Sequence, residues 1–168
     1  KVRVSDYQTI TYNKPSVTSR LVANVAFNSV NINIYTPDAA LFRENDYIKI
    51  NDEILKITAI DTNSGQLTVD RNQFSTPLRL HATTNTVTLH IPDDQPDYRI
   101  AVGDAITSPG VAGVVYQIDK VNSKIDVRVT SGTITNSINI PDTSTPTGRP
   151  IDIADVTGKS VYWEIDPT

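Results

Sequence analysis

The side chains of this chain that could do chemistry are carboxylates, hydroxyls and two histidines, because it contains no cysteine. His81 and His90 are nine residues apart, and a zinc site would need more ligands than these two. In the alternating run Val87-x-Leu89-x-Ile91, His90 falls on the polar face, which is typical of a solvated histidine. The histidines therefore predict no metal site.

The acidic residues form groups that could carry other chemistry. Asp93, Asp94 and Asp97 could gather around a calcium ion, but the Asp-x-Asp-x-Asp-Gly order of a calcium loop is absent. Two prolines in the same stretch already explain a rigid polar linker. Paired acids could supply the two carboxylates of a glycosidase, but here they lie at expected strand starts and turns, where acids are common for solubility alone. These pairs are Glu44/Asp46 and Asp52/Glu53.

The remaining sequence signals argue against an enzyme, a nucleic-acid binder and a membrane-inserted protein. There is no Gly-x-Ser-x-Gly elbow, so nucleophilic catalysis has no support. Fifteen Lys and Arg against nineteen Asp and Glu give a net charge of −4, and the two signs are interspersed without a basic stripe. The longest apolar-leaning run, Leu21 to Phe27, is far shorter than the roughly 20 residues of a membrane helix. We expect no catalytic residues, no metal and no cofactor.

Composition and periodicity predict an all-β fold. Val, Ile and Thr are abundant, and ten Pro with seven Gly punctuate the chain. Residues 1–20 are polar and indicate an arm. The run 21–27 and the alternating Val30-x-Ile32-x-Ile34 favour a hairpin through Asn28 and Ser29. After it, Asp38 is a good N-cap for one short helical turn.

The rest of the chain contains an internal repeat. Each copy reads as strand, turn, long bent strand, tight turn and strand, which is the plan of small five-stranded barrels. The copies align when the second has three extra residues in its first loop. We therefore predict tandem small antiparallel β-barrel or sandwich modules: residues 1–36 as arm and hairpin, 37–93 as the first module and 97–168 as the second. The aligned segments are Asp46-Tyr47-Ile48, Ile57-x-x-Ile60 and Leu67-x-Val69 against Asp104-Ala105-Ile106, Ile118-x-x-Val121 and Ile125-x-Val127.

The first module ends in Leu67-Thr68-Val69-Asp70-Arg71, followed by Thr76 and His81 at intervals of five residues. This pattern resembles a module that recurs in structural proteins of tailed bacteriophage particles. The family pattern has a strand ending in Glu and an aliphatic pair, then Leu-Thr-Val-x-Arg, Gly-Thr and a later His. Glycine is usual in the family where this chain has Asn72 and Ser75. The motif residues that the chain keeps are Glu53, Thr58, Thr68, Arg71, Thr76 and His81.

The resemblance implies a structural His81, hydrogen-bonded across a loop that Arg71 and Thr76 also frame. It implies a non-enzymatic component of a tailed-phage virion or a related contractile injection machine, from the tail, baseplate or fibre-attachment region. Such a protein would be assembled in the host cytoplasm, with other virion subunits as partners in a homo- or hetero-oligomer. The alternative is a carbohydrate-binding or adhesin module for a host surface glycan. In that case Tyr98, Tyr162 and Trp163 would cluster on one exposed face and stack on sugar rings.

Overall fold

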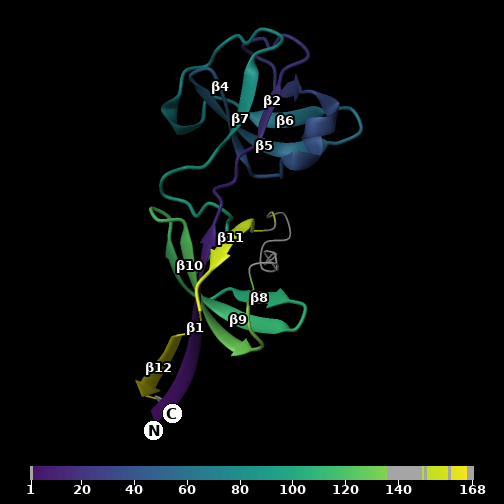
Figure 1. Ribbon diagram of the computed structural model, residues 1–168. Coiled ribbons are helices and arrows are strands. Elements are labelled where there is room, and N and C mark those ends of the chain that lie inside the picture. Colours follow the sequence, from purple (N-terminus) through teal and green to yellow (C-terminus); the bar gives the residue numbers. More distant parts are fainter. Residues whose placement is uncertain (1, 136–148, 150, 159, 166–168) are drawn as a thin grey trace. The chain divides into compact units, whose positions relative to one another are not determined.

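The computed structural model describes residues 2–135, 149, 151–158 and 160–165 (Figure 1). These residues form two antiparallel six-stranded sheets, and the helices among them are two short 3-10 segments, η1 (Thr36–Leu41) and η2 (Gln73–Ser75). The predicted all-β fold with two antiparallel β modules is confirmed. β-branched residues and frequent turns produce it, because they favour short strands over helices.

The chain divides into two compact units, one of which is discontinuous in sequence. We call residues 16–93 the inserted module, and residues 1–15 with 94–168 the split module. These bounds differ from the predicted 1–36, 37–93 and 97–168. The reason is that residues 2–12 form a long strand of the split module, whereas the segment after residue 15 belongs to the inserted module.

The sheet of the inserted module has the strand order β2-β7-β4-β5-β6-β3. An isolated bridge between Leu21 and Ile34 connects its two edges, since these residues directly follow β2 and β3. Thirteen buried apolar residues, from Leu21 to Val87, fill the interior. The strands are β2 (Thr18–Arg20), β3 (Asn31–Asn33), β4 (Tyr47–Ile50), β5 (Glu53–Asp61), β6 (Gln66–Asp70) and β7 (Thr86–His90).

Two local expectations for residues 21–42 need correction. The segments 21–27 and 30–34 pair only at their outer ends, where Leu21 bridges to Ile34 and the N–H of Val22 donates to the Asn33 carbonyl. Closer to the turn, Val25 bridges to His81 and β3 pairs with β6 instead. Asp38 is not the N-cap residue of the helical turn. It lies within η1, and its carboxylate accepts a hydrogen bond from the Ser19 hydroxyl at 2.7 Å, which connects η1 to β2.

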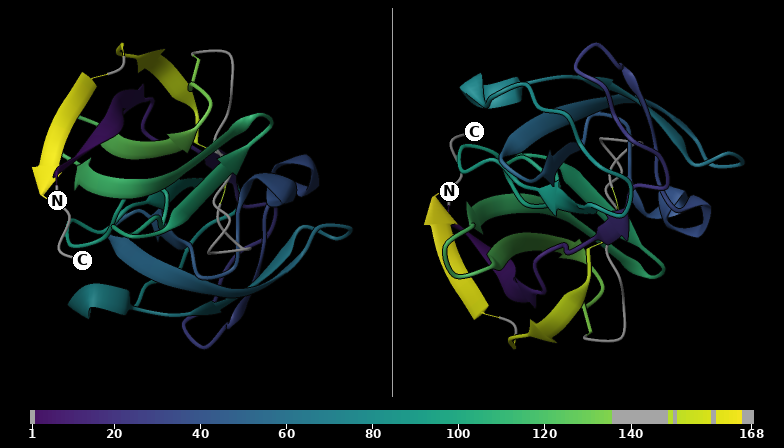
Figure 2. Two further views of the ribbon diagram at one scale, coloured as in Figure 1. Left: turned by 90° about the horizontal axis from the view of Figure 1, so that it is seen from below. Right: turned by 90° about the horizontal axis from the view of Figure 1, so that it is seen from above.

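The sheet of the split module has the order β11-β1-β10-β9-β8, with β12 also paired to β1, and it curls into a half-barrel (Figure 2). β1 is its central strand: it pairs with β10 on one edge and with β11 and β12 on the other. Apolar residues of β1, β9 and β10 dominate the core. The strands are β1 (Val2–Tyr12), β8 (Ala105–Ser108), β9 (Val111–Asp119), β10 (Lys124–Ser131), β11 (Ile153–Val156) and β12 (Ser160–Ile165).

The predicted internal repeat is present as two three-stranded meanders, β4-β5-β6 and β8-β9-β10. Asp46 accepts a hydrogen bond from the N–H of Ile57 through its carbonyl, and Asp104 does the same for Val115. In each copy the aspartate carboxylate also accepts the N–H three residues before it, at 2.8 and 2.9 Å. Equivalent residues are 58 positions apart throughout, as Asp46 and Asp104 are.

This constant spacing corrects the predicted alignment, which placed three extra residues in the second copy. Ile57 corresponds to Val115 and not to Ile118, and the second copy has no insertion in its first loop. Both long strands bulge at the same point, at Thr58 and at Tyr116, where the register with the next strand shifts. The spacing of Ile57 and Ile60 recurs in the second copy both at Val115/Ile118 and at Ile118/Val121, so the sequence pattern alone permitted the displacement by three residues.

Candidate functional site

Three of the motif residues meet inside the inserted module. Glu53 begins β5, Arg71 follows β6, and His81 bridges to Val25. The Arg71 guanidinium contacts the Glu53 carboxylate through two parallel hydrogen bonds, Nε to Oε2 at 2.8 Å and Nη2 to Oε1 at 3.0 Å. His81 Nε2 lies 2.8 Å from Glu53 Oε1. The Glu53 and His81 side chains have no exposed surface, and that of Arg71 is 7% exposed.

The backbone completes the surroundings of the Glu53 carboxylate. The N–H of Asn72 donates to Oε2 and the N–H of Arg79 donates to Oε1, each at 3.0 Å. Burial alone would raise the pKa of Glu53, but the hydrogen bonds from Arg71, Asn72, His81 and Arg79 outweigh it and lower this pKa to about 2. At neutral pH, Glu53 is therefore a charged acceptor within the protein core.

Arg71 also holds three backbone carbonyls. Its Nη1 donates to the carbonyl oxygens of Ala26 and Ser29, each at 2.8 Å, and its Nη2 donates to that of Arg79 at 2.6 Å. One guanidinium thus connects the start of β5, the turn before β3 and the segment that leads to His81. Such a planar group with several fixed donors suits this cross-linking role, which a lysine could not fill.

The hydrogen bonds of His81 define its tautomer. The Asn51 side-chain nitrogen lies 3.3 Å from His81 Nδ1, and an amide nitrogen can only donate. With the amide in this orientation, Nδ1 accepts and Nε2 donates to the Glu53 carboxylate.

The threonines of the motif form hydrogen bonds with groups around the cluster and not with the Glu53 carboxylate. Thr76 Oγ1 accepts the N–H of Ile54 at 3.0 Å and donates to the carbonyl of Gln73 at 2.7 Å, so it joins the loop after β6 to β5. Thr58, at the exposed bulge of β5, donates to the carbonyl of Thr68 at 3.2 Å. The Thr58 hydroxyl thus stabilises the pairing of β5 with β6. The Thr68 hydroxyl donates to Asn31 Oδ1 in β3 at 3.1 Å.

The loop between Arg71 and Thr76 has an unusual backbone. Asn72, Phe74 and Ser75 have φ values of 42°, 54° and 59°, in the left-handed region that glycine adopts most easily. Asn72 and Ser75 are the two positions where the phage-like pattern usually has glycine. In this chain both positions adopt the left-handed conformation with side chains present.

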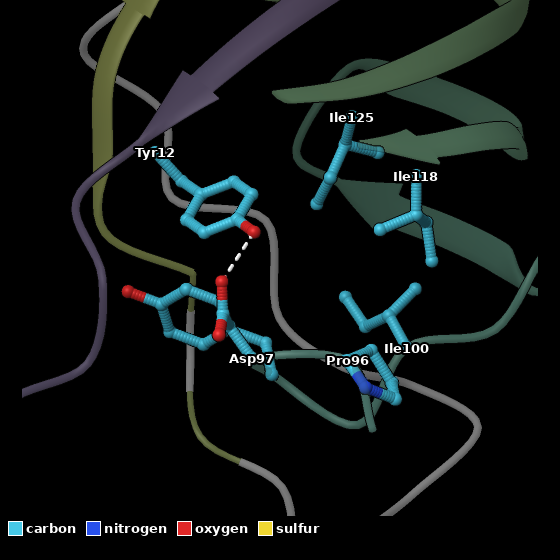
Figure 3. Close-up of a pocket in the computed structure, with 7 residues that line it drawn as sticks. Tyr12, Pro96, Asp97, Ile100, Ile118 and Ile125 are labelled. Atoms are coloured by element: carbon cyan, nitrogen blue, oxygen red, sulfur yellow. Dashed lines mark hydrogen bonds between the residues drawn. The ribbon is translucent and has the colours of Figure 1, made fainter. Parts of the chain in front are cut away.

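A second polar group lies in the split module, and no sequence motif signals it. Tyr12, Asp97 and Tyr98 line a small pocket with apolar neighbours (Figure 3). The Tyr12 hydroxyl donates to the Asp97 carboxylate at 2.5 Å, and burial together with this carboxylate raises the pKa of Tyr12 well above its ordinary value. The pocket holds about 10 Å³, roughly the volume of one water. It is too small for an organic substrate.

Of the three aromatic side chains proposed for glycan stacking, the structure describes that of Tyr98. Tyr98 is buried, and its hydroxyl donates to the Asn13 carbonyl, so it offers no exposed ring face. Tyr162 and Trp163 lie in β12, opposite Ser5 and Val4, but their side chains are outside the described part of the structure. Tyr98 therefore cannot belong to an exposed stacking face.

The acids weighed as metal or catalytic groups are dispersed. Asp97 faces Tyr12, whereas Asp93 and Asp94 are exposed. Asp52 forms an exposed ion pair with Arg79, whose guanidinium lowers the pKa of Asp52, and its neighbour Glu53 is buried. Among the described residues, no three His, Asp or Glu side chains are grouped to hold a metal ion. No helix in the same described part has the length and apolar character to cross a membrane.

The cluster of Glu53, Arg71 and His81 is thus the most developed polar site in the described structure. Every oxygen of its carboxylate accepts at least two hydrogen bonds, so none remains for a substrate. Its arrangement is that of a structural cross-link between distant segments. Comparison with models of known protein families finds none that matches this chain, and comparison with curated protein sequences finds no significant match.

Proposed function

We propose that this chain is a non-enzymatic structural component of a tailed-phage virion or a related contractile injection machine, in the tail, baseplate or fibre-attachment region. The observation that carries the proposal is the buried cluster of Glu53, Arg71 and His81. These residues carry the resemblance to phage structural modules, and they contact one another directly. A motif that had arisen by chance would not be expected to converge on one carboxylate.

The chemistry of the cluster supports a mechanical role. Glu53 and Arg71 neutralise each other in the core, and Arg71 links three backbone segments that are far apart in sequence. A buried, fully hydrogen-bonded ion pair favours one defined arrangement of the chain over alternatives. A subunit that must present fixed surfaces to its neighbours needs such a defined arrangement.

The proposal places the protein in particles assembled in the host cytoplasm, with other virion subunits as partners. Its test is to purify phage or injection particles from the source cells on a density gradient and to follow this protein by mass spectrometry. We expect it to co-sediment with intact particles at a constant ratio to a major tail subunit. A protein found only in particle-free fractions would contradict the proposal.

Immunogold electron microscopy on the same particles would locate the protein. Label at the tail tip, baseplate or fibre base agrees with the proposed region. Label over the head would contradict that part of the proposal while leaving the virion role intact.

A further inference from the structure

β1 is longer than the sheet to which it belongs. It pairs with β10 over Asp6–Thr11, and this pairing ends at Asp6. On its other edge, β12 pairs with residues 2–7 over its whole length without a register shift. Residues 2–5 and β12 thus form a two-stranded ribbon that extends away from β8, β9 and β10 (Figure 1).

Both outer edges of this ribbon lack a partner strand within the part of the chain that the structure describes. One is the edge of residues 2–5 that faces away from β12, and the other is the outer edge of β12. An unpaired edge presents backbone N–H and C=O groups that can accept another strand. Natural edge strands usually prevent this with proline, bulges or several charges. Residues 2–5 and 160–165 contain no proline or glycine and one charged residue each, Arg3 and Glu164.

We propose that the ribbon is an interface between copies of this chain, in which β12 of one copy adds to the outer edge of residues 2–5 of the next. The pairing within one chain already shows that the two strands match: Arg3 lies opposite Glu164, Val2 opposite Ile165 and Val4 opposite Trp163. On the other edge of β1, Asp6 and Tyr7 are already paired with β10, so the same register can repeat there over residues 162–165. This register places Arg3 of one copy opposite Glu164 of the next. Opposite charges in directly paired positions stabilise a sheet, and like charges destabilise it.

This complementarity favours a second copy over an unrelated partner. The contact is heterologous, because it joins two different edges, so it generates a closed ring or a linear array. Self-association of this chain through the ribbon does not depend on a virion role.

Sedimentation velocity of the full chain over a wide range of concentration tests the association. Amide hydrogen exchange on the same samples locates the contact. We expect the sedimentation coefficient to increase with concentration while exchange slows several-fold in residues 2–5 and 162–165 and stays unchanged in β2 of the inserted module. A chain that remains monomeric throughout overturns the proposal, and so does association that protects a different region.

A disulfide-stapled variant separates edge addition from an exchange of β12 between copies. The double substitution Ser5→Cys and Tyr162→Cys places two thiols at paired positions within one chain and keeps Arg3 and Glu164. Oxidation of the dilute, monomeric protein then fixes β12 to its own β1. Edge addition leaves both outer edges available, so the oxidised variant should still associate. Association that is lost on oxidation and restored by reduction would show strand exchange and overturn the proposed contact.

Discussion

Glu53 keeps its charge inside the inserted module because five donors surround its two oxygens. Removing a carboxylate from water is costly, and the cost is offset only when the geometry of its partners is good. Here a bidentate guanidinium and two backbone N–H groups supply that geometry, and His81 supplies the fifth hydrogen bond. The ion pair between Glu53 and Arg71 mainly restricts the chain to one conformation, because any other conformation would leave a buried charge without a partner.

We predict that Arg71→Ala destabilises the inserted module by about 3–5 kcal/mol, because it leaves the buried Glu53 charge unpaired and three carbonyls without their donor. Chemical denaturation followed by hydrogen exchange in β5 and β6 measures this change. Arg79→Ala is the matched control. The Arg79 side chain pairs with Asp52 where both are more than half exposed, and its backbone N–H to Glu53 is kept, so little change is expected.

An unchanged unfolding transition in Arg71→Ala would contradict the assignment of this cluster as a structural cross-link. An equal loss in Arg71→Ala and Arg79→Ala would indicate that general surface charge, and not the buried pair, stabilises the module.

The lowered pKa of Glu53 predicts an acid-sensitive stability. Because the folded-state pKa of about 2 lies below the ordinary 4.5, the stabilisation is fully present above pH 4.5 and is lost as the pH falls toward 2. The size of this shift corresponds to about 3 kcal/mol at neutral pH. Unfolding free energies of the inserted module, measured at several pH values from 7 to 2, test the prediction.

Glu53→Gln is the control for the acid effect. This variant should be less stable than the native protein at neutral pH, but its stability should change much less between pH 4.5 and 2. If the native protein and the Glu53→Gln variant had the same pH profile, other carboxylates would be the cause of the acid sensitivity.

At the residue scale, the sequence predicted polar contacts where the residues involved lie close together in the chain. Arg71, Thr76 and His81 follow one another at regular intervals, so a loop framed by these three residues could be expected from the resemblance. The convergence of Arg71 and His81 on the Glu53 carboxylate was not predicted. The pair Tyr12 and Asp97 could not be expected, because its members are 85 residues apart and Asp97 lies in a segment whose prolines and acids are typical of a linker. Burial of Asp97 depends on the position of β1, which no nearby residue signals.

Among the structural elements, the loop from residue 72 to residue 75 stores backbone strain. Its three residues with positive φ would each be accommodated more easily by glycine, since a side chain in the left-handed region costs roughly 1–2 kcal/mol. The loop connects Arg71 to Thr76, and both ends are anchored by hydrogen bonds to β5 or to Glu53. These anchors hold the loop in a conformation that its sequence does not favour.

We therefore predict that Ser75→Gly stabilises the inserted module by about 0.5–1 kcal/mol, because relief of the strain exceeds the extra freedom that glycine gives the unfolded chain. Ser131→Gly is a suitable control, since Ser131 is exposed and lies in the extended strand β10, where glycine should destabilise. Thermal unfolding of both variants distinguishes the cases. A Ser75→Gly protein that melts earlier than the native protein would argue against strain in the loop.

The long strands show which features of an element can be recognised from sequence. Alternating apolar residues predicted three strands in each copy, and these strands are present. The bulges at Thr58 and Tyr116 were not predicted, since a bulge adds one residue without a characteristic side chain. In the predicted alignment only the middle strand was displaced, by three residues, whereas the first and third segments were placed at their true correspondence.

At the scale of the whole molecule, one module is inserted between the first strand of the other and its remainder. The sequence predicted consecutive modules because the first 20 residues are polar and indicate an arm. In fact β1 buries Ile10 and Tyr12 against β10 and its neighbours. Pairing between segments more than 100 residues apart leaves no local trace in the sequence, so this nesting could not be foreseen.

The nesting predicts that residues 16–93 fold as an isolated fragment, because all thirteen residues of their core lie within that range. Deletion of residues 1–15 should have the opposite effect on the split module, which would lose its central strand. Hydrogen exchange of the fragment should match that of the same residues in the full chain, and the deletion should abolish protection in β10 and β11. An unfolded fragment, or a deletion that leaves β10 protected, would contradict the division into these two modules.

The position of β1 also has a consequence for how the protein is made. During synthesis, β1 emerges from the ribosome long before β10, to which it pairs, and the whole inserted module lies between them. At translation rates of about 5–20 residues per second, this interval lasts on the order of ten seconds. The inserted module has time to fold first. During that time β1 is a nascent segment that cannot yet pair with β10. Chaperone protection of this strand would therefore matter most in the middle of translation.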